Sequence, residues 1–280
     1  ETPYPLRCPL GKYHPDAKDY YLDDLKKTIQ KIGSENIAAL LMEPINGSSG
    51  GAITPPDGYW TEAQEILREN DILLIADEVM TGFGRVGQDF ASKLYNIEPD
   101  ILIAGKGMGG GYAAIGGTYS TDEIADSIQK AGYEVMFHTF AALPQSCAAS
   151  AEVLKILRKE QLCERVKPIG ENILHNLNSE IGQHPNVAEI RGEGLLIGIE
   201  IVKDKDSLKP FDESRGMNEL DQSLEKVRNI LLQKGIVVVL INEFYEAIDY
   251  DNGEPYEKEI IDNILELLDM GRPKDVEITL

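Results

Sequence analysis

Three polar residues able to do chemistry each follow a short apolar run in the first half of the chain. Glu43 follows IAALLM, Asp77 follows ILLIA, and Lys106 comes two residues after DILIA. Uninterrupted apolar runs that alternate with amphipathic segments such as TEAQEILREN are typical of parallel strands covered on both faces. Because ligands bind beyond the carboxyl ends of such strands, we expect these three side chains at one functional edge of a sheet.

Lys106 stands in the glycine-rich stretch GKGMGGG. Glycines remove side chains around one position, which lets a flat ligand approach the backbone closely. In a tight apolar pocket a lysine loses hydration, and this favours the neutral amine that attacks carbonyl groups and forms a Schiff base. The ordinary alternative for Lys106 alone is a lysine that extends from a strand end into solvent.

The acidic pair in ILLIADE has several interpretations. It resembles the magnesium-binding strand of a nucleotide hydrolase, but the chain lacks the GxxxxGK[ST] loop that such an enzyme needs. An aspartate after a strand also commonly caps a turn. An acid that keeps a ring nitrogen protonated, together with a lysine that forms an imine, is the pair required by a pyridoxal phosphate enzyme, and Asp77 with Lys106 suggests such a site.

The rest of the sequence predicts a second, smaller domain. Residues 144–181 have helical periodicity, with a break or kink at Pro168. VAEIRGEGLLIGIEIV indicates a strand pair, followed by a helix at 219–234, the strand GIVVVLI and a helix at 256–270. We therefore expect an α/β fold with a mostly parallel sheet in a large domain at 1–145, a connecting helical segment at 146–186, and a small α+β domain at 187–280.

Composition limits the partners. The 280 residues carry a formal net charge of -21, from 27 Lys+Arg against 48 Asp+Glu, which disfavours nucleic acid and anionic membranes. The three cysteines and four histidines show no metal-ligand spacing, so we expect neither a metal site nor a disulfide framework. No apolar run is long enough to span a membrane and no signal peptide is visible, so a cytoplasmic protein is expected, although the missing initial Met is compatible with a preceding segment.

Taken together, several longer stretches resemble the class III pyridoxal-phosphate-dependent aminotransferases of fold type I. They are MEPINGSSGGAITPPDGYW, ILLIADEVMTGFGRVGQDFA, PDILIAGKGMGGGYAAIGG, HTFAALP and RGEGLLIGIEIV. They occur in the order and spacing of that family, and the resemblance covers Pro5 to about Arg215. It implies the large domain of a fold type I enzyme with pyridoxal 5'-phosphate as its cofactor.

The resemblance assigns roles by position. Lys106 resembles the lysine that holds the cofactor as an internal aldimine and later moves the proton between the substrate and cofactor carbons. Asp77 resembles the aspartate that pairs with the pyridine nitrogen, and Val79 the residue that packs on one face of the ring. Thr139 resembles the threonine that binds the cofactor phosphate of a neighbouring subunit, which implies a homodimer.

Three further positions match less closely. Met80 stands where many family members have a glutamine that contacts the oxygen on the cofactor ring, and a thioether is a weak acceptor. Glu43 resembles a glutamate near the substrate. Arg85 matches a common family position, where satisfying nearby carbonyls is as good an explanation as binding substrate.

Two departures from the family pattern leave alternatives open. The stretches matching the family's N-terminal part, with its phosphate-binding loop and ring-stacking aromatic residue, do not occur here, and similarity fades beyond Met217. The resemblance implies a transaminase acting on an amine or amino acid and a 2-oxo acid. The alternatives are a non-catalytic remnant or subunit of a split aminotransferase that needs an N-terminal partner chain, and a pyridoxal-phosphate-dependent aminomutase.

Overall fold

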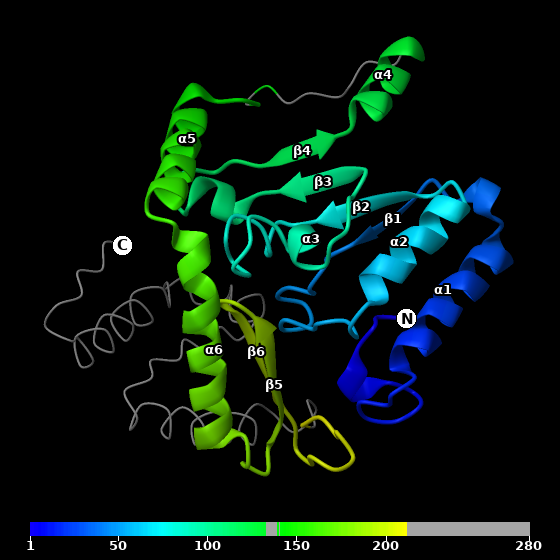
Figure 1. Ribbon diagram of the computed structural model, residues 1–280, viewed down its shortest axis with the longest axis vertical. Coiled ribbons are helices and arrows are strands. Elements are labelled where there is room, and N and C mark those ends of the chain that lie inside the picture. Colours follow the sequence, from blue (N-terminus) through cyan, green and yellow to red (C-terminus); the bar gives the residue numbers. More distant parts are fainter. Residues whose placement is uncertain (133–138, 140, 212–280) are drawn as a thin grey trace, which may run out of the picture. The chain divides into compact units, whose positions relative to one another are not determined.

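A four-stranded sheet forms the centre of the computed structural model, which describes residues 1–132, 139 and 141–211. Its strands lie side by side in the order β1 (Ala39–Met42), β2 (Leu73–Asp77), β3 (Ile101–Ala104) and β4 (Gly117–Ser120) (Figure 1). Strands β1, β2 and β3 run parallel to one another, whereas β4 runs antiparallel to β3. The predicted α/β fold with a mostly parallel sheet is confirmed, and β4 is a strand that the apolar pattern did not reveal.

Helices connect and follow these strands. The described elements are η1 (Pro5–Arg7), α1 (Ala17–Ile32), η2 (Ser34–Asn36), α2 (Tyr59–Glu69), α3 (Ala91–Leu94), η3 (Lys106–Gly109), α4 (Asp122–Lys130), α5 (Pro144–Lys159) and α6 (Leu162–Ile181). Strands β5 (Val187–Glu193) and β6 (Leu196–Ile201) form a separate two-stranded sheet. The predicted strand pair in VAEIRGEGLLIGIEIV is confirmed.

The main core lies where α1 and α2 pack against each other and α2 packs against β2 (Figure 1). Trp60, Ala63 and Leu67 follow helical spacing along α2 and are all buried. The indole N–H of Trp60 donates to the carbonyl of Pro44 at 2.9 Å. This bond attaches α2 to the chain just after β1, where the candidate site begins.

The long helical stretch is interrupted at a different place than the sequence predicted. α5 ends at Lys159 and α6 begins at Leu162, so the break lies at Glu160 and Gln161, whereas Pro168 lies inside α6. Gln161 has a φ of 51°, a left-handed conformation that ends a run of right-handed helix. The expected break at Pro168 is not found, because this proline lies beyond the first turn of α6 and removes one hydrogen bond of the helix interior without ending the helix.

The chain divides into two compact units. One contains Glu1–Asn178 and Val187–Glu200, and the other takes in Ser179–Asn186 and the chain from Ile201 onward. The expected helices at 219–234 and 256–270 and the strand GIVVVLI lie outside the described residues. The division into a large domain, a connecting segment and a small domain stays a prediction. None of the helices in the described part of the chain is long and apolar enough to cross a membrane.

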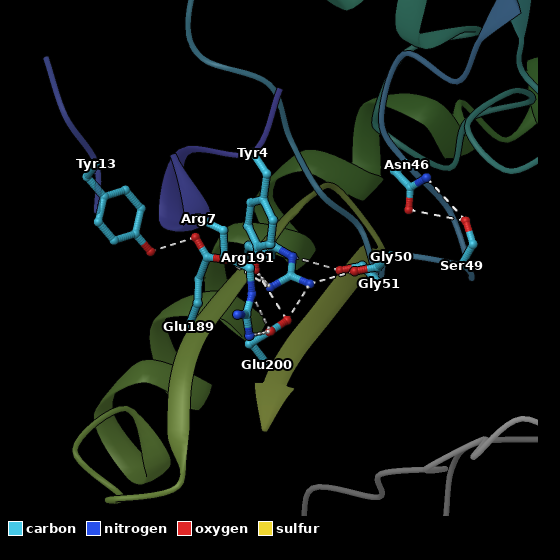
Figure 2. Close-up of polar contacts among 10 residues, drawn as sticks. All are labelled: Tyr4, Arg7, Tyr13, Asn46, Ser49, Gly50, Gly51, Glu189, Arg191 and Glu200. Carbon is cyan, nitrogen blue, oxygen red and sulfur yellow. Dashed lines mark hydrogen bonds and ion pairs between the residues drawn. The ribbon is translucent and has the colours of Figure 1, made fainter. Parts of the chain in front are cut away.

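A buried arginine connects the N-terminal segment with the β5–β6 sheet (Figure 2). The side chain of Arg191 is 6% exposed and pairs with Glu189 at 2.8 Å and Glu200 at 3.1 Å. Its guanidinium lies 5.0 Å from the centroid of the Tyr4 ring, and it donates to the Tyr4 hydroxyl at 2.7 Å. Arg7 also pairs with Glu200, at 2.6 Å. Two acids and two arginines therefore meet in one cluster, in which Arg191 is buried and Arg7 is exposed.

Burial and charge act in opposite directions on the ionisable groups of this cluster. Burial alone raises the pKa of Glu200, but the hydrogen bond from Arg7 and the positive charge of Arg191 bring it below its ordinary value. Burial raises the pKa of the Tyr4 phenol, which therefore stays a hydrogen-bond donor. Glu200 is thus ionised and held by both arginines at neutral pH.

We predict that acid weakens this cluster through Glu200. Its folded-state pKa lies below the ordinary 4.5, so ionised Glu200 stabilises the fold above pH 4.5, and this contribution is lost as the pH falls through the folded-state pKa. Urea unfolding should therefore show a smaller loss of stability between about pH 5 and about pH 3 in Glu200→Gln than in the unchanged protein. Parallel pH profiles of the two proteins would contradict the prediction.

Candidate functional site

The three polar residues that follow the apolar runs lie at one edge of the main sheet. Glu43 comes directly after β1, Asp77 ends β2, and Lys106 follows β3 after one intervening glycine. Met42 pairs with Ala76 and Asp77 pairs with Ile103 in the parallel ladders. The shared edge is the arrangement that the sequence predicted, and the parallel register produces it.

Asp77 keeps one carboxylate oxygen available for a ligand. It is half-buried, and its Oδ1 accepts a hydrogen bond of 3.0 Å from the backbone N–H of Val79. Among the residues that the structure describes, Oδ2 has no hydrogen-bond partner. Asp77 borders a cavity of about 380 Å³, here called the Asp77 cavity, together with Glu43, Asn46 and Trp60. A ligand group that donates a hydrogen bond could be held by Oδ2 from this cavity.

The carboxylate of Glu43, at the same cavity, stabilises the loop that follows β1. Its Oε2 accepts hydrogen bonds from the backbone N–H of Gly47 at 3.1 Å and from the side-chain amide of Asn46 at 2.9 Å. The carboxylate therefore fixes the beginning of the loop that follows β1. A role for Glu43 near the substrate stays a prediction.

Lys106 lies at a second cavity, of about 570 Å³, here called the Lys106 cavity. Val79, Met80 and Arg85 also line it. The side chain of Lys106 is exposed, so the expected desolvation of this lysine by a tight pocket is not found. Its Nζ lies 2.6 Å from Sδ of Met80, a weak acceptor. The amine is therefore not engaged by a strong acceptor in the described part of the chain.

The backbone around Lys106 explains part of the glycine-rich pattern. Lys106 has a φ of 39°, a left-handed conformation that is uncommon for a residue with a side chain. A Cβ atom at Gly107 would lie 3.2 Å from Cβ of Phe83, so this glycine lets η3 pack closely on the loop after β2. Gly107 is therefore needed for close packing of the backbone, whereas the sequence suggested that this glycine leaves space for a ligand.

Two side chains after Asp77 link its strand to Lys106. Val79 faces Gly105, since a Cβ there would lie 3.7 Å from both methyl groups of Val79. Met80 contacts Lys106 through sulfur, and a Cβ at Gly47 would lie 2.6 Å from Cγ of Met80. Lys106 is therefore grouped with Val79 and Met80, and Asp77 with Glu43. All share the sheet edge, but the two groups border different cavities.

Arg85 and Thr139 complete the predicted positions. Nη1 of Arg85 donates to the carbonyl of Leu195 at 3.4 Å, and the backbone N–H of Leu195 donates to the carbonyl of Arg85 at 2.9 Å. This agrees with an arginine that satisfies nearby carbonyls. Thr139 is exposed in a turn, and its sequence neighbours 133–138 and 140 lie outside the described residues.

Glu78 is a residue whose importance the sequence analysis missed. It is 0% exposed, and its carboxylate accepts hydrogen bonds from the backbone N–H groups of Ala91 at 2.9 Å and Ser92 at 2.7 Å and from the hydroxyl of Thr81. These donors include the start of α3. Glu78 therefore closes the loop between β2 and α3 that carries Val79, Met80 and Arg85. The acidic pair that ends ILLIADE was the available sign of Glu78 in the sequence. Glu78 is the second acid of that pair, and it is buried.

We predict that Glu78→Gln lowers the free energy of unfolding by about 2–4 kcal/mol, because an amide cannot accept all of these hydrogen bonds and brings donors of its own against backbone N–H groups. Urea unfolding at neutral pH measures the change. Glu98→Gln is the matched control, since Glu98 is 92% exposed and pairs only with Arg68 at 3.6 Å in the described structure. Equal stability of the two variants would show that the Glu78 contacts are unimportant.

The fold and the paired acid and lysine at the sheet edge define the class of protein. A sequence model described as aminotransferase class-III matches residues 2–256. This match continues beyond Arg215, where the motifs had suggested that the resemblance ends. The chain belongs to the class III aminotransferases, so it is an enzyme by family, and pyridoxal phosphate is the cofactor of that class.

Particular relatives agree with this family. The chain is 40% identical over 196 residues to putrescine–pyruvate aminotransferase of Pseudomonas aeruginosa, covering 70% of this chain and 43% of that protein. It is 42% identical over 178 residues to acetylornithine aminotransferase of Methanothermobacter thermautotrophicus, covering 64% of this chain and 44% of that protein. The chain thus spans about half the length of the curated relatives it matches.

Solved structures give the same fold. An (S)-enantioselective omega-transaminase from Thermomicrobium roseum matches with a TM-score of 0.72 and 38% identity, over 76% of this chain and 47% of that one. An amine transaminase from an uncultivated Pseudomonas species, solved in its cofactor-bound form, matches with a TM-score of 0.73 and 35% identity, over 77% of this chain and 50% of that one. Both establish the fold as that of fold type I transaminases.

Proposed function

We propose that this chain carries the lysine and aspartate half of a pyridoxal phosphate site in an aminotransferase that moves an amino group from an amine or amino acid to a 2-oxo acid. One observation carries the proposal. Asp77 ends β2 and Lys106 follows the adjacent parallel strand β3, so a carboxylate with an available oxygen and a primary amine lie at one sheet edge.

The residues at this edge have the chemistry that the cofactor requires. When bound, pyridoxal phosphate supplies a protonated ring that takes up the electron pair of a bond at the amine-bearing carbon of the substrate. Oδ2 of Asp77 would accept the hydrogen bond of the ring nitrogen, and its negative charge would keep that nitrogen protonated. Val79, whose methyl groups face Gly105, would offer an apolar contact to the ring.

Lys106 has two tasks in this proposal. With the cofactor bound, the amine of Lys106 would hold it through a covalent bond, and as a free amine it would remove and return the proton at the substrate carbon. Its exposure and its contact with a weak acceptor leave the nitrogen accessible for both. Met80, in place of the common glutamine, offers only a thioether to the oxygen on the cofactor ring.

A second candidate follows from the span of the chain. The chain covers about half the length of its curated relatives. In this candidate, a second copy or a separate N-terminal partner chain supplies further groups of the site. The exposed hydroxyl of Thr139 is available to bind the cofactor phosphate of a neighbouring subunit, in line with a homodimer. A chain active only with a partner would be a subunit of a split aminotransferase.

We predict that pyridoxal phosphate followed by borohydride reduction labels Lys106, because its amine is accessible at the carboxyl end of β3. Peptide mapping locates the label. Lys106→Arg should abolish this label, since a guanidinium forms no stable imine. Lys93→Arg, at an exposed lysine paired with Asp89, is the matched control and should leave the label in place. Label spread over many lysines with none preferred would refute the proposal.

Asp77→Asn should retain the label on Lys106 but weaken binding of pyridoxal phosphate by about tenfold or more, since it removes a charge-assisted hydrogen bond worth about 1.5–3 kcal/mol. Titration of the cofactor absorption measures the affinity. Asp89→Asn serves as the control, because the carboxylate of Asp89 is exposed and Asp89 lines neither the Asp77 cavity nor the Lys106 cavity. An unchanged affinity in Asp77→Asn would remove Asp77 from the cofactor site.

A further inference from the structure

The guanidinium of Arg191 uses its full hydrogen-bonding capacity. An arginine has five N–H groups, and Arg191 makes contacts from all three of its nitrogens. Nη1 donates to Glu189 and the Tyr4 hydroxyl, while Nη2 also contacts Glu200. The remaining bonds reach successive backbone carbonyls: Nη2 donates to Gly50 at 2.7 Å, and Nε donates to Gly51 at 2.8 Å (Figure 2).

These two carbonyls belong to a closed loop, here called the 46–53 loop. The backbone N–H of Asn46 donates to the carbonyl of Ile53 at 3.0 Å, and that of Gly51 donates to Gly47 at 2.8 Å. The amide of Asn46 also donates to the hydroxyl of Ser49 at 3.2 Å (Figure 2). These hydrogen bonds connect the loop to itself, while Glu43 holds its start and Arg191 its far side.

The β5–β6 sheet makes a second close contact with the same loop. A Cβ atom at Gly198, in β6, would lie 2.0 Å from the carbonyl oxygen of Gly51. Only a glycine allows this approach. The position of Gly51 is therefore set both by the hydrogen bond from Arg191 and by the absence of a side chain at Gly198.

The 46–53 loop reaches the candidate cofactor site from its other side. Asn46 and Ile53 line the Asp77 cavity. Gly47 lies against Met80, whose sulfur contacts the amine of Lys106. A displacement of the loop away from Arg191 would therefore change the walls of both the Asp77 cavity and the Lys106 cavity.

We infer that Arg191 is a positioning residue, which holds the carbonyls of Gly50 and Gly51 and thereby keeps the 46–53 loop against Met80 and Lys106. This inference rests on the proposed function for its consequence at the cofactor site. The ion pairs with Glu189 and Glu200 fix the guanidinium itself. A lysine could keep one ion pair but has no planar fork to bridge two successive carbonyls.

The test compares three variants of the chain by two measurements. The first is hydrogen exchange of the backbone amides in the 46–53 loop, with the amides of α2 as the measure of overall folding. The second is the concentration of pyridoxal phosphate that half-saturates the borohydride label on Lys106. Arg191→Lys removes the bridge, and Gly198→Ala displaces Gly51 while leaving the ion pairs of Arg191 intact. Arg7→Lys is the matched control, because Arg7 pairs with the same Glu200 from a side chain that is 38% exposed.

We expect Arg191→Lys and Gly198→Ala to speed exchange in the loop by about tenfold, with α2 unchanged, and to raise the half-saturating concentration by about fivefold. Arg7→Lys should change neither. Should Arg191→Lys fail to fold, Gly198→Ala alone decides the result in the same way.

Two results would overturn the inference. Unchanged exchange in the loop would show that Arg191 does not hold it, and faster exchange with unchanged labelling would show that the loop position does not matter at Lys106. If the unchanged protein takes up no label on Lys106, the proposed function fails and the inference falls with it. This last result is recognised before any variant is made, so the two failures are distinguishable.

Discussion

Parallel hydrogen bonding between β1, β2 and β3 is the constraint on which the rest of the structure depends. Parallel strands place their carboxyl ends at one edge, and the register that pairs Met42 with Ala76 and Asp77 with Ile103 brings the following residues to that edge together. The loops after each strand then have to pack against one another. Side chains from three separate segments become neighbours through this backbone arrangement.

Two buried charges of opposite sign stabilise the loops at this edge. Glu78 accepts bonds from the start of α3, and Arg191 donates to the 46–53 loop, and both are almost fully withdrawn from water. A buried charge is tolerated only when its hydrogen-bonding capacity is met, so each one demands a particular placement of several backbone groups. Met80 lies against Gly47 and contacts Lys106, so the loop after β2 and the 46–53 loop meet beside the same lysine.

The two polar groups at this sheet edge, the amine of Lys106 and the carboxylate of Asp77, are accessible in the described part of the chain. Lys106 is exposed and Asp77 half-buried with one oxygen available, although a cofactor site in an enzyme excludes most water. The chain matches its family over most of its own length but spans about half of its relatives. The lysine and the aspartate therefore lie at this sheet edge with their polar groups accessible among the residues that the structure describes.

The sequence by itself determined the strands β1, β2 and β3, α2 and the family, because apolar runs and local motifs are encoded in neighbouring residues. Glu43, Asp77 and Lys106 could be placed at one edge by the same reasoning. Only the tertiary structure decided that Asp77 and Lys106 border different cavities, that the helix break lies at Gln161, and that Gly107 serves backbone packing. It also revealed the burial of Glu78, which accepts hydrogen bonds across the loop after β2, and the contacts of Arg191 with Gly50 and Gly51, which lie far away along the chain. Burial and hydrogen bonding between distant segments depend on how the whole chain packs, and no local pattern records them.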